Sequence, residues 1–283
     1  MVNVQKIFCK KLISPDLKKD QHFLVDSKIV EKMVAIAGVT KKDVVLEVGT
    51  GFGILTKKLA QHAKEVISIE IDERFKPFLR ELPGNVKVIY GNAYKLLNDK
   101  DFTKKYKKIT KTVSNIPFSQ AQNMLHNYTN SSWYSGDIVW LAPASLARKV
   151  NNDAILGAYF DAKFKQVVPK SAFYPKPNTD CAIIFLKRIP DPNKTKNFEI
   201  YFRRWLYEHE DWKVKNALRE SIIAAAYNIK NVKVSKRNAK EVISRFGLSE
   251  KQLNEKTNNL DLKYYFDFPK VLNEWLSKFQ KDN

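Results

Sequence analysis

The sequence predicts an α/β protein: a doubly wound, mostly parallel sheet followed by a small helical domain. Three observations support this prediction. Short apolar runs rich in Val and Ile alternate with segments of helical spacing, as in a parallel sheet with helices on its faces. One of these runs ends in three glycines at alternate positions, where a strand would turn into a helix. After residue 190 the spacing of apolar residues is helical throughout, without a convincing strand.

The elements of the sheet are expected in a regular order along the chain. A helix over residues 27–37, capped by Asp26 or Ser27 and ended by Gly38, precedes the first strand. Because no helix separates the last two strands, one of them should run antiparallel to the others. Seven strands are expected, at residues 44–48, 65–72, 86–91, 111–114, 137–142, 164–168 and 181–186. Helices are expected at about 56–64, 74–82 and 119–127 and after Pro143, with a polar loop after Ala93.

The proline-rich segment 189–193 is expected to separate two domains, since prolines interrupt both helices and strands. The domains would comprise residues 1–190 and 191–283. No apolar run approaches the roughly 18 residues of a membrane span, and the first residues lack the apolar stretch of a signal peptide. Two cysteines and four singly placed histidines suggest no metal site. We therefore expect a cytoplasmic protein without a bound metal or a membrane association.

The charge balance points to a polyanionic partner. Lys and Arg total 50 against 30 for Asp and Glu, so the net charge is +20. Proteins this basic bind nucleic acids by releasing condensed counterions. The excess recurs in residues 6–19, 100–111 and 202–219, which favours a broad nucleic-acid surface over a single basic arm. The alternative is a generally lysine-rich composition that reflects no particular partner.

The glycine turn indicates a nucleoside cofactor. A dinucleotide-binding turn has the spacing G-x-G-x-x-G, in which the third glycine lets helix and strand pack closely. Here the glycines are Gly49, Gly51 and Gly53, and position 54 is isoleucine, which argues against a dinucleotide. Glu70 closes the second strand further on, where its carboxylate can accept hydrogen bonds from both hydroxyls of a ribose. Together these features suggest S-adenosylmethionine, although such glycines also occur in ordinary tight turns.

Residues 115–118 end the fourth strand, at the sheet edge where folds of this type bind ligands. The amide oxygen of Asn115 and the backbone carbonyl of Pro117 are acceptors, and Phe118 offers a flat apolar face on which a base can stack. This set suits the exocyclic amine of adenine. Two acceptors on its N–H bonds would localise the nitrogen lone pair, which is otherwise delocalised into the ring. The alternative is a strand-ending turn in which Asn caps and Pro stiffens the chain.

Several motifs, spread over nearly the whole chain, resemble those of the rRNA adenine N6-dimethyltransferase family. This family contains the small-subunit dimethyladenosine transferases and the large-subunit macrolide-resistance methyltransferases. Their order and separation make the resemblance specific. The motifs are Gln21-His22-Phe23-Leu24, the glycine turn beginning at Glu47, Glu70, Asn115-Ile116-Pro117-Phe118, and Phe173-Tyr174-Pro175-Lys176-Pro177 followed by Asp180.

The resemblance implies a Rossmann-like class I methyltransferase sheet and an enzyme that transfers methyl groups from S-adenosylmethionine to N6 of adenine in ribosomal RNA. We expect dimethylation, small-subunit before large-subunit RNA, and a monomer acting on rRNA or a pre-ribosomal subunit. His22 would contact the methionine end of the cofactor, or would instead cap the helix that begins near Ser27. The catalytic residues would be Asn115, Pro117 and Phe118. The cofactor-binding residues would be Gln21, His22, Leu24, Gly49, Gly51, Glu70, Ile71, Asn92, Ala93 and Asn115.

The resemblance also implies that the helical domain helps to grip RNA. Trp205 and Trp212 could stack on bases, although aromatic residues at helical spacing more often belong to a core. A solvated helix face is the alternative for the cations of this domain. The candidate RNA-binding residues are Arg203, Arg204, Lys213, Lys215 and Arg219.

The chain departs from the family pattern at three places. Asn92 stands where the family has an Asp that accepts from the adenine amine of the cofactor, and its amide oxygen can still accept. Ala142-Pro143-Ala144 replaces Gln-Lys-Glu, and Cys181 replaces a Ser. The alternative function is an rRNA-binding assembly or transcription factor with weak or no methyl transfer. A DNA adenine methyltransferase is less favoured, since the chain lacks the Asp-Pro-Pro-Tyr motif of those enzymes.

Overall fold

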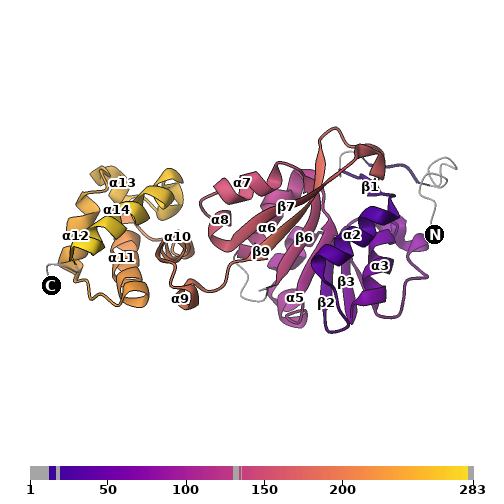
Figure 1. Ribbon diagram of the computed structural model, residues 1–283, viewed down its shortest axis with the longest axis horizontal. Coiled ribbons are helices and arrows are strands. Elements are labelled where there is room, and N and C mark those ends of the chain that lie inside the picture. Colours follow the sequence, from indigo (N-terminus) through magenta and orange to yellow (C-terminus); the bar gives the residue numbers. More distant parts are fainter. Residues whose placement is uncertain (1–12, 17–19, 130–133, 135, 280–283) are drawn as a thin grey trace. The chain divides into compact units, whose positions relative to one another are not determined.

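The computed structural model describes residues 13–16, 20–129, 134 and 136–279 (Figure 1). Cys9 and most of the basic segment 6–19 lie outside these residues. Contacts divide the chain into two compact units. The sheet unit comprises the residues up to Val150 and Asp161–Arg188, and the helical unit comprises Asn151–Phe160 and the residues from Ile189 onward. The segment Asn151–Phe160, which we expected in the first domain, therefore groups with the helical unit.

The sheet unit is built on a seven-stranded sheet whose order is β4-β3-β2-β5-β6-β9-β7. Its strands are β2 (Val44–Val48), β3 (Glu65–Glu70), β4 (Val86–Tyr90), β5 (Lys111–Asn115), β6 (Asp137–Pro143), β7 (Phe160–Val168) and β9 (Cys181–Arg188). Strand β2 pairs in parallel with β3 and β5, whereas β6 and β9 are antiparallel, with Trp140 opposite Ile184. The expected doubly wound sheet, with one of the last two strands of the chain antiparallel to its neighbour, is confirmed.

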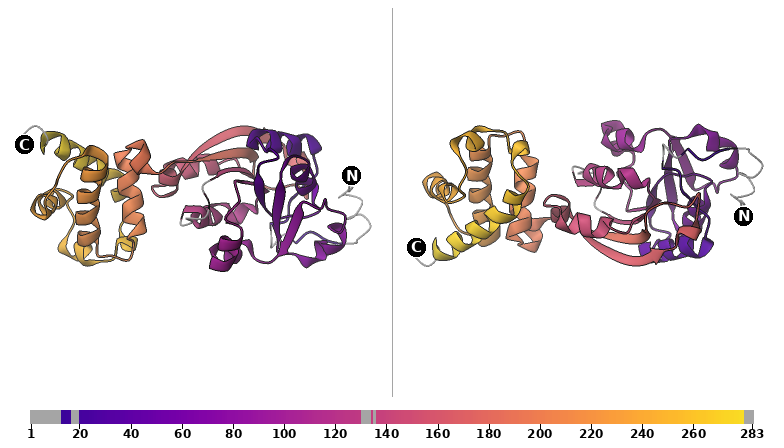
Figure 2. Two further views of the ribbon diagram at one scale, coloured as in Figure 1. Left: turned by 90° about the horizontal axis from the view of Figure 1, so that it is seen from below. Right: turned by 90° about the horizontal axis from the view of Figure 1, so that it is seen from above.

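Helices connect the parallel strands and cover both faces of the sheet. In Figure 2, α2 (indigo) lies on one face and α5 (purple) lies on the opposite face. Met33 of α2 packs with Val45, Val113 and Leu141 of the sheet, and all four side chains are fully buried. The helices are α2 (Ser27–Ala37), α3 (Ile54–His62), α4 (Ala93–Asn98), α5 (Lys100–Lys105), α6 (Ala121–Thr129) and α7 (Leu146–Asn152). Short 3₁₀ helices lie at Glu73–Phe78 (η2), Phe118–Gln120 (η3) and Lys170–Ala172 (η4).

The ends of α2 follow from local sequence signals. The Asp26 carboxylate accepts a hydrogen bond from the Lys28 amide at 2.8 Å and so satisfies one of the free amides of the first turn. Gly38 ends the helix in the left-handed conformation, with φ 55°, which other residues adopt only at a cost. Both boundaries were predicted, and Asp26 is the cap.

Two segments of the sheet unit differ from the sequence-based expectation. The helix expected over 74–82 is only the six-residue η2, because Pro77 lacks the amide hydrogen that a longer α-helix needs. The polar loop expected after Ala93 forms α4 and α5 instead. The side chains of Asn92 and Asp99 cap these two helices, and short capped helices leave little apolar periodicity to recognise.

A small two-stranded sheet ties the N-terminal segment to the segment before β9. Strand β1 (Phe23–Leu24) pairs antiparallel with β8 (Phe173–Tyr174), with Phe23 opposite Tyr174. The pair was not predicted, because two residues carry no period from which a strand could be read. It fixes the segment that lies over the glycine turn.

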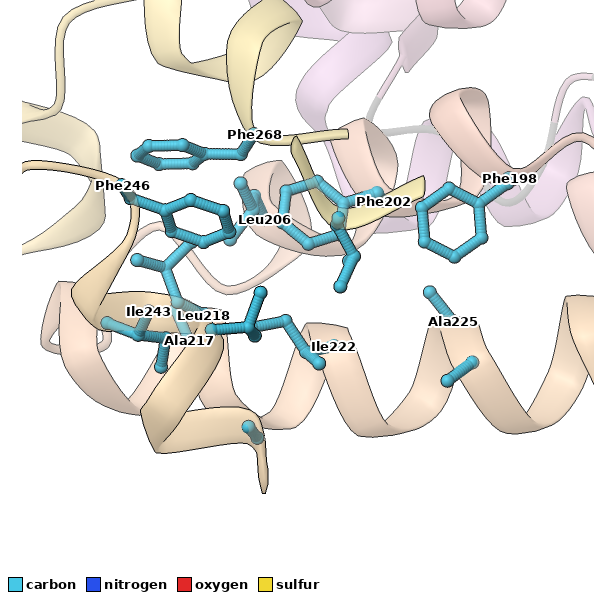
Figure 3. Packing of buried hydrophobic residues seen from close by; sticks show 14 of the residues in the cluster. Phe198, Phe202, Leu206, Ala217, Leu218, Ile222, Ala225, Ile243, Phe246 and Phe268 are labelled. Carbon is cyan, nitrogen blue, oxygen red and sulfur yellow. The ribbon is translucent and has the colours of Figure 1, made fainter. Parts of the chain in front are cut away.

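The helical unit surrounds a core of its own. Its helices are α8 (Leu156–Tyr159), α9 (Pro192–Thr195), α10 (Phe198–Glu208), α11 (Val214–Lys230), α12 (Lys236–Ser244), α13 (Glu250–Asn254) and α14 (Lys263–Phe279), with a 3₁₀ helix (η5) at Thr257–Asn259. Figure 3 shows Phe202 of α10 and the stacked rings of Phe246 and Phe268 facing Leu218 and Ile222 of α11. Within the described residues, no helix combines the length and the apolar character needed to cross a membrane.

Replacing Phe202 by Ala should strongly destabilise the helical unit. Phe202 is fully buried in its core, and removing a buried phenyl ring costs about 3–5 kcal/mol through lost contacts and the cavity left behind. Tyr227→Ala is a matched control, because Tyr227 lies on α11 with 55% of its surface exposed. Denaturant unfolding followed by circular dichroism should show this loss for Phe202→Ala and a change within about 0.5 kcal/mol for the control. Equal losses in both variants would contradict the packing described.

Candidate active site

A cavity of about 210 Å³ lies at the carboxyl edge of the sheet, beyond the ends of β2, β3, β4 and β5. Leu24, a predicted cofactor contact, lies outside it and lines a smaller neighbouring cavity of about 40 Å³. The other residues predicted to bind cofactor or to act in catalysis all line the larger cavity: Gln21, His22, Gly49, Gly51, Glu70, Ile71, Asn92, Ala93, Asn115, Pro117 and Phe118. The topology thus brings together side chains from four separate segments of the chain.

Residues that the sequence analysis did not single out also line this cavity, among them Tyr94, Gln120 and Met124. Tyr94 lies in the first turn of α4 and is 50% exposed. Gln120 and Met124 belong to η3 and α6, which follow the motif at the end of β5. Their place directly after two motif-bearing strands is the signal by which they could have been found.

The glycine turn keeps side chains away from the cavity. Gly49, Gly51 and Gly53 have φ values of 85°, 52° and 75°, in the left-handed region that glycine adopts without strain. A Cβ on Gly51 would come within 3.3 Å of the Phe23 ring, which lies over the turn. The turn therefore needs glycine both for its backbone conformation and for the close approach of the N-terminal segment.

Glu70 is held in place by backbone amides at the end of β3. Its Oε2 accepts from the Gly51 amide at 2.8 Å, its Oε1 accepts from the Asp72 amide at 2.8 Å, and the residue is 4% exposed. Burial raises the pKa of this carboxyl, and these two hydrogen bonds oppose the rise. Each carboxylate oxygen accepts more than one hydrogen bond, so both keep acceptor positions for hydroxyl groups of a ligand.

Asn115 contributes a fixed acceptor to the site. Its Nδ2 donates to the His22 carbonyl at 2.8 Å, and because a carbonyl only accepts, the orientation of the amide is determined. Its Oδ1 is buried and has no hydrogen-bond partner among the described residues. A buried acceptor without a partner is costly and marks a place that a ligand donor can fill.

His22 is a wall of the cavity and does not cap a helix. Its Nδ1 lies 2.9 Å from the Pro175 carbonyl and must therefore carry the hydrogen, since the carbonyl only accepts. The imidazole stacks on Phe118 with ring centres 5.9 Å apart and planes 19° apart. The helix cap considered for His22 is wrong, because Asp26 caps α2.

Glu47 lies beneath the glycine turn and is 1% exposed. Its Oε2 accepts from the hydroxyls of Thr56 and Ser68, each at 2.7 Å, while its Oε1 has no partner among the described residues. Burial raises the pKa of this carboxyl to about 8, although the two hydroxyls lower it in part. Glu47 also lines the small cavity next to Gly49, so an acid with an open oxygen faces the space behind the turn.

Asn92 both caps a helix and lines the cavity. Its Oδ1 accepts from the Lys95 amide at 3.2 Å and so caps α4, and the residue also lines the large cavity. An amide oxygen has two lone pairs, so one remains for a ligand donor. Ile71, which is 54% exposed, presents an apolar surface on the same side of the cavity.

Arg204, a candidate RNA-binding residue, is buried and bonded within the protein. It is 8% exposed, and its guanidinium donates to the backbone carbonyls of Ala158, Ile189 and Pro190 at 2.9–3.2 Å. The guanidinium also lies 4.5 Å from the centre of the Tyr159 ring. Its five donors make it a clamp between α10 and the segment Asn151–Phe160. This clamp explains why that segment groups with the helical unit.

The other candidate cations of the helical unit differ in their surroundings. Arg203 packs over the Phe266 ring at 5.0 Å, pairs with Glu199, and has only 12% of its side chain exposed, so it too is mainly structural. Lys215 and Arg219 line a cavity between α11, α12 and α13. Lys213 precedes α11 as its N-cap residue. These three remain candidates for an RNA contact.

The tryptophans divide in the same way. Trp205 packs against the helical core, as the core interpretation predicted, and its ring stacks on the His209 imidazole at 3.6 Å. Trp212 is 44% exposed.

Among the described residues no group of three His, Cys, Asp or Glu side chains could hold a metal ion, and the absence of a metal remains a prediction. Cys181 is buried, and burial raises the pKa of its thiol to about 11, as expected of a packing residue.

The fold and this constellation define a class of protein. A doubly wound sheet with an antiparallel strand near its edge, a glycine turn after β2, an acid at the end of β3 and an Asn-Ile-Pro-Phe motif at the end of β5 are the features of a class I methyltransferase that uses S-adenosylmethionine. The family of proteins described as ribosomal RNA adenine dimethylase matches residues 17–243, and the chain belongs to this family.

Individual relatives agree with this assignment. The chain is 32% identical over 255 residues to a protein of Methanosarcina barkeri named as a probable ribosomal RNA small subunit methyltransferase A, covering 85% of this chain and 82% of the relative. A protein of the same name from Pyrococcus abyssi is 30% identical, with 85% and 87% covered. The fold is similar to a crystal structure of a dimethyladenosine transferase from Plasmodium falciparum (TM-score 0.57, 21% identity, 91% and 98% covered). It is also similar to that of the 23S rRNA methyltransferase ErmE (TM-score 0.52, 18% identity, 89% and 99% covered).

Replacing Glu47 by Gln should remove a pH-dependent loss of stability. A carboxyl whose pKa rises from 4.5 in the unfolded chain to about 8 in the folded protein holds a proton that the unfolded chain has lost. Between these values the free energy of unfolding therefore falls by about 1.4 kcal/mol per pH unit on account of this group. Denaturant unfolding between pH 5 and pH 8 should show the wild type losing stability relative to Glu47→Gln as the pH rises. Parallel profiles would mean that Glu47 is ionised in the folded protein.

Proposed function

We propose that this chain uses S-adenosylmethionine to dimethylate N6 of adenine in the RNA of the small ribosomal subunit. Membership in the dimethylase family makes the chain a ribosomal RNA adenine methyltransferase. The observation that carries the proposal is the fixed, unpartnered Oδ1 of Asn115, a residue that lines the same cavity as the glycine turn and Glu70. The names of the archaeal relatives favour the small subunit.

The residues present fit the cofactor. The oxygens of Glu70 are oriented by backbone amides and accept from the ribose hydroxyls. Ile71 offers an apolar face to the adenine ring, and Asn92 offers an acceptor to its amine. The glycine turn lets the methionine part approach the backbone, with Glu47 beneath it. When bound, S-adenosylmethionine supplies an electrophilic methyl group on a sulfonium.

The target amine is prepared by residues at the end of β5. Asn115 Oδ1 and the Pro117 carbonyl accept the two N–H bonds of the adenine amine, which localises its lone pair toward the methyl group. Phe118 and the His22 ring beside it form the apolar surface on which the base stacks. With S-adenosylmethionine bound, this nitrogen would take the methyl group as the sulfur leaves as a thioether, and the amine would lose one proton to solvent. In a second transfer the monomethylated amine would have one N–H left, which one of the two acceptors would hold.

The proposed partner is a ribosomal RNA or a pre-ribosomal subunit, bound in the cytoplasm by a monomer. The net charge of +20 supplies the general attraction to RNA. The cavity admits a single base, so the target adenosine has to leave its stack before it reacts. Mass-spectrometric mapping of methyladenosines in both rRNAs, with and without this protein, identifies the target. Dimethyladenosine in the large subunit alone would overturn the choice of subunit.

Asn115→Ala should lower methyl transfer far more than it lowers the affinity for S-adenosylmethionine, because the variant removes the acceptor and only loosens the N-terminal wall of the cavity. Removing one preorganised polar group that acts in the transition state costs about 100- to 1,000-fold in rate. Transfer from labelled cofactor to unmodified small-subunit RNA measures the rate, and calorimetry measures cofactor affinity. Asn85→Ala is the matched control, because Asn85 donates to the carbonyls of Ala60 and Ala63 and does not line the cavity.

Full transfer by Asn115→Ala would remove the role assigned to its Oδ1. The second candidate function, an assembly factor, rests on the replacement of the family acid by Asn92. Tight binding of the RNA by the wild type, with no transfer of label, would support the assembly-factor function and overturn the proposed methyl transfer.

Asn92→Asp should tighten the binding of S-adenosylmethionine. A carboxylate keeps the cap of α4, since Asp caps helices as well as Asn does. It also accepts from the adenine amine through a charge-assisted hydrogen bond, which is worth about 1 kcal/mol more than a neutral one. Calorimetry should therefore show an affinity about fivefold higher. An unchanged affinity would place the adenine amine away from residue 92.

A further inference from the structure

A second cavity, of about 360 Å³, lies entirely within the helical unit. Lys215, Asn216 and Arg219 from the first half of α11 form one side of it. Lys240 and Ser244 of α12 form another side. The cavity at the end of the sheet is lined by none of these residues.

The rim of this cavity is cationic. Its described lining includes Lys215, Arg219 and Lys240 and no acidic side chain. Lys215 donates to Asn254 Oδ1 at 2.8 Å, a neutral acceptor that leaves its charge uncompensated. Arg219 contacts Glu220 through its Nε at 2.8 Å, which leaves its two terminal nitrogens to donate elsewhere. The cavity also adjoins the first turns of a 17-residue helix, whose N-terminal end is electropositive.

The floor of the cavity is apolar, and its walls carry groups that read a base edge. Ile243 is 7% exposed, and Leu248 and Leu253 are half-buried, so a flat ring can rest on aliphatic side chains. Asn216 provides both a donor and an acceptor. The hydroxyl of Ser244 donates to the Glu241 carbonyl at 2.6 Å and keeps its own acceptor positions.

This combination selects one class of ligand. A nucleotide presents an anionic phosphate beside a flat ring with hydrogen-bonding edges, and the cavity presents cations beside an apolar floor with an amide and a hydroxyl. Its volume lies within the roughly 300–1,000 Å³ of small-ligand sites. The ring can enter only when it is unpaired, because a base in a duplex presents no free face. The cavity therefore suits single-stranded nucleic acid.

The surroundings of the cavity favour a polymer over a free nucleotide. Lys213 and Lys256 are joined by an antiparallel backbone bridge just before α11. The adjacent Val214 amide donates to the Glu255 carbonyl at 2.9 Å, so both lysines belong to the end of α11 that carries Lys215. Asp211 Oδ1 lies 3.1 Å from Lys256 Nζ and forms an ion pair with it. Cations thus continue beyond the cavity, where the neighbouring phosphates of a chain would lie.

We propose that the cavity between α11, α12 and α13 binds one unpaired nucleotide of the RNA substrate, separate from the adenosine that is methylated. Lys215, Arg219 and Lys240 contact its phosphate and the next one. Its base rests on Ile243, Leu248 and Leu253. This inference rests on the proposed function, because it takes ribosomal RNA as the substrate.

Two kinds of variant test the phosphate and the base separately. The double variant Lys215→Ala and Lys240→Ala removes two phosphate contacts. It should lower the affinity for a small-subunit rRNA transcript at least tenfold. The slope of log binding constant against log salt concentration should become less steep by about two. Lys263→Ala with Lys270→Ala is the matched control, since these α14 lysines face Asp261 and Asp267 outside the cavity. The control should change affinity less than threefold.

Leu253→Trp fills the cavity without changing charge. It should lower affinity for the transcript about tenfold and leave the salt slope unchanged, while the rate of transfer at saturating RNA stays normal. Unfolding measurements establish that each variant is folded. Normal affinity of Leu253→Trp for the transcript would show that no base enters the cavity and would overturn the proposal. An equal loss of affinity in the cavity lysine pair and the control lysine pair would also overturn it.

Further outcomes separate this proposal from its alternatives. Binding of adenosine monophosphate is measured as well. If it binds the wild type but not Leu253→Trp, and does not compete with the transcript, the cavity is a site for free nucleotides and the proposal is overturned. If the wild type binds and methylates the RNA and the cavity variants do so equally well, this inference alone is overturned. A wild type that does not bind the transcript overturns both the inference and the proposed function.

Discussion

The hydrogen bond from Asn115 to the carbonyl of His22 joins the two sides of the candidate active site. It uses the donor half of the amide, so that the buried oxygen remains as an acceptor, and it holds the N-terminal segment over the glycine turn. Two neighbouring bonds reinforce it: the Ser119 amide donates to Asp20, and Gln21 donates to Asp72 beyond β3. The N-terminal wall of the cavity and the buried Asn115 oxygen are therefore parts of one hydrogen-bonded assembly.

The cavities of the sheet unit and of the helical unit are lined by different ionisable groups. The chain as a whole carries +20, and the cavity of the helical unit is lined by cations. The space around the glycine turn instead has the buried acids Glu47 and Glu70, whose pKa values burial raises. A cofactor that carries a sulfonium and an ammonium favours the ionised form of such acids. The cations therefore line the cavity of the helical unit, and the buried acids belong to the sheet unit.

Much of the sheet unit was predictable because its signals are local. Buried parallel strands appear as apolar runs, and the glycine turn and the Asn-Ile-Pro-Phe motif lie directly after such runs, so the positions of Gly51, Glu70 and Asn115 at one sheet edge followed from topology. The misplaced residues depend on distant partners. Arg204 reads as a surface cation until the carbonyls of residues 158, 189 and 190 close around it. The helices α4 and α5 were missed because their caps, and not a long apolar face, define them.

The pairing of β1 with β8 has a consequence for the order in which the protein is completed. The His22 ring and the Pro175 carbonyl that holds it are 153 residues apart, and Phe23 pairs with Tyr174 beside them. During synthesis, the strands that carry the glycine turn and Glu70 emerge long before the segment that secures the N-terminal cover over them. A nascent chain therefore lacks the β1–β8 pairing and the contact that holds the His22 ring until residues 173–175 have been synthesised. The cavity at the end of the sheet acquires its complete N-terminal wall only when nearly all of the sheet unit exists.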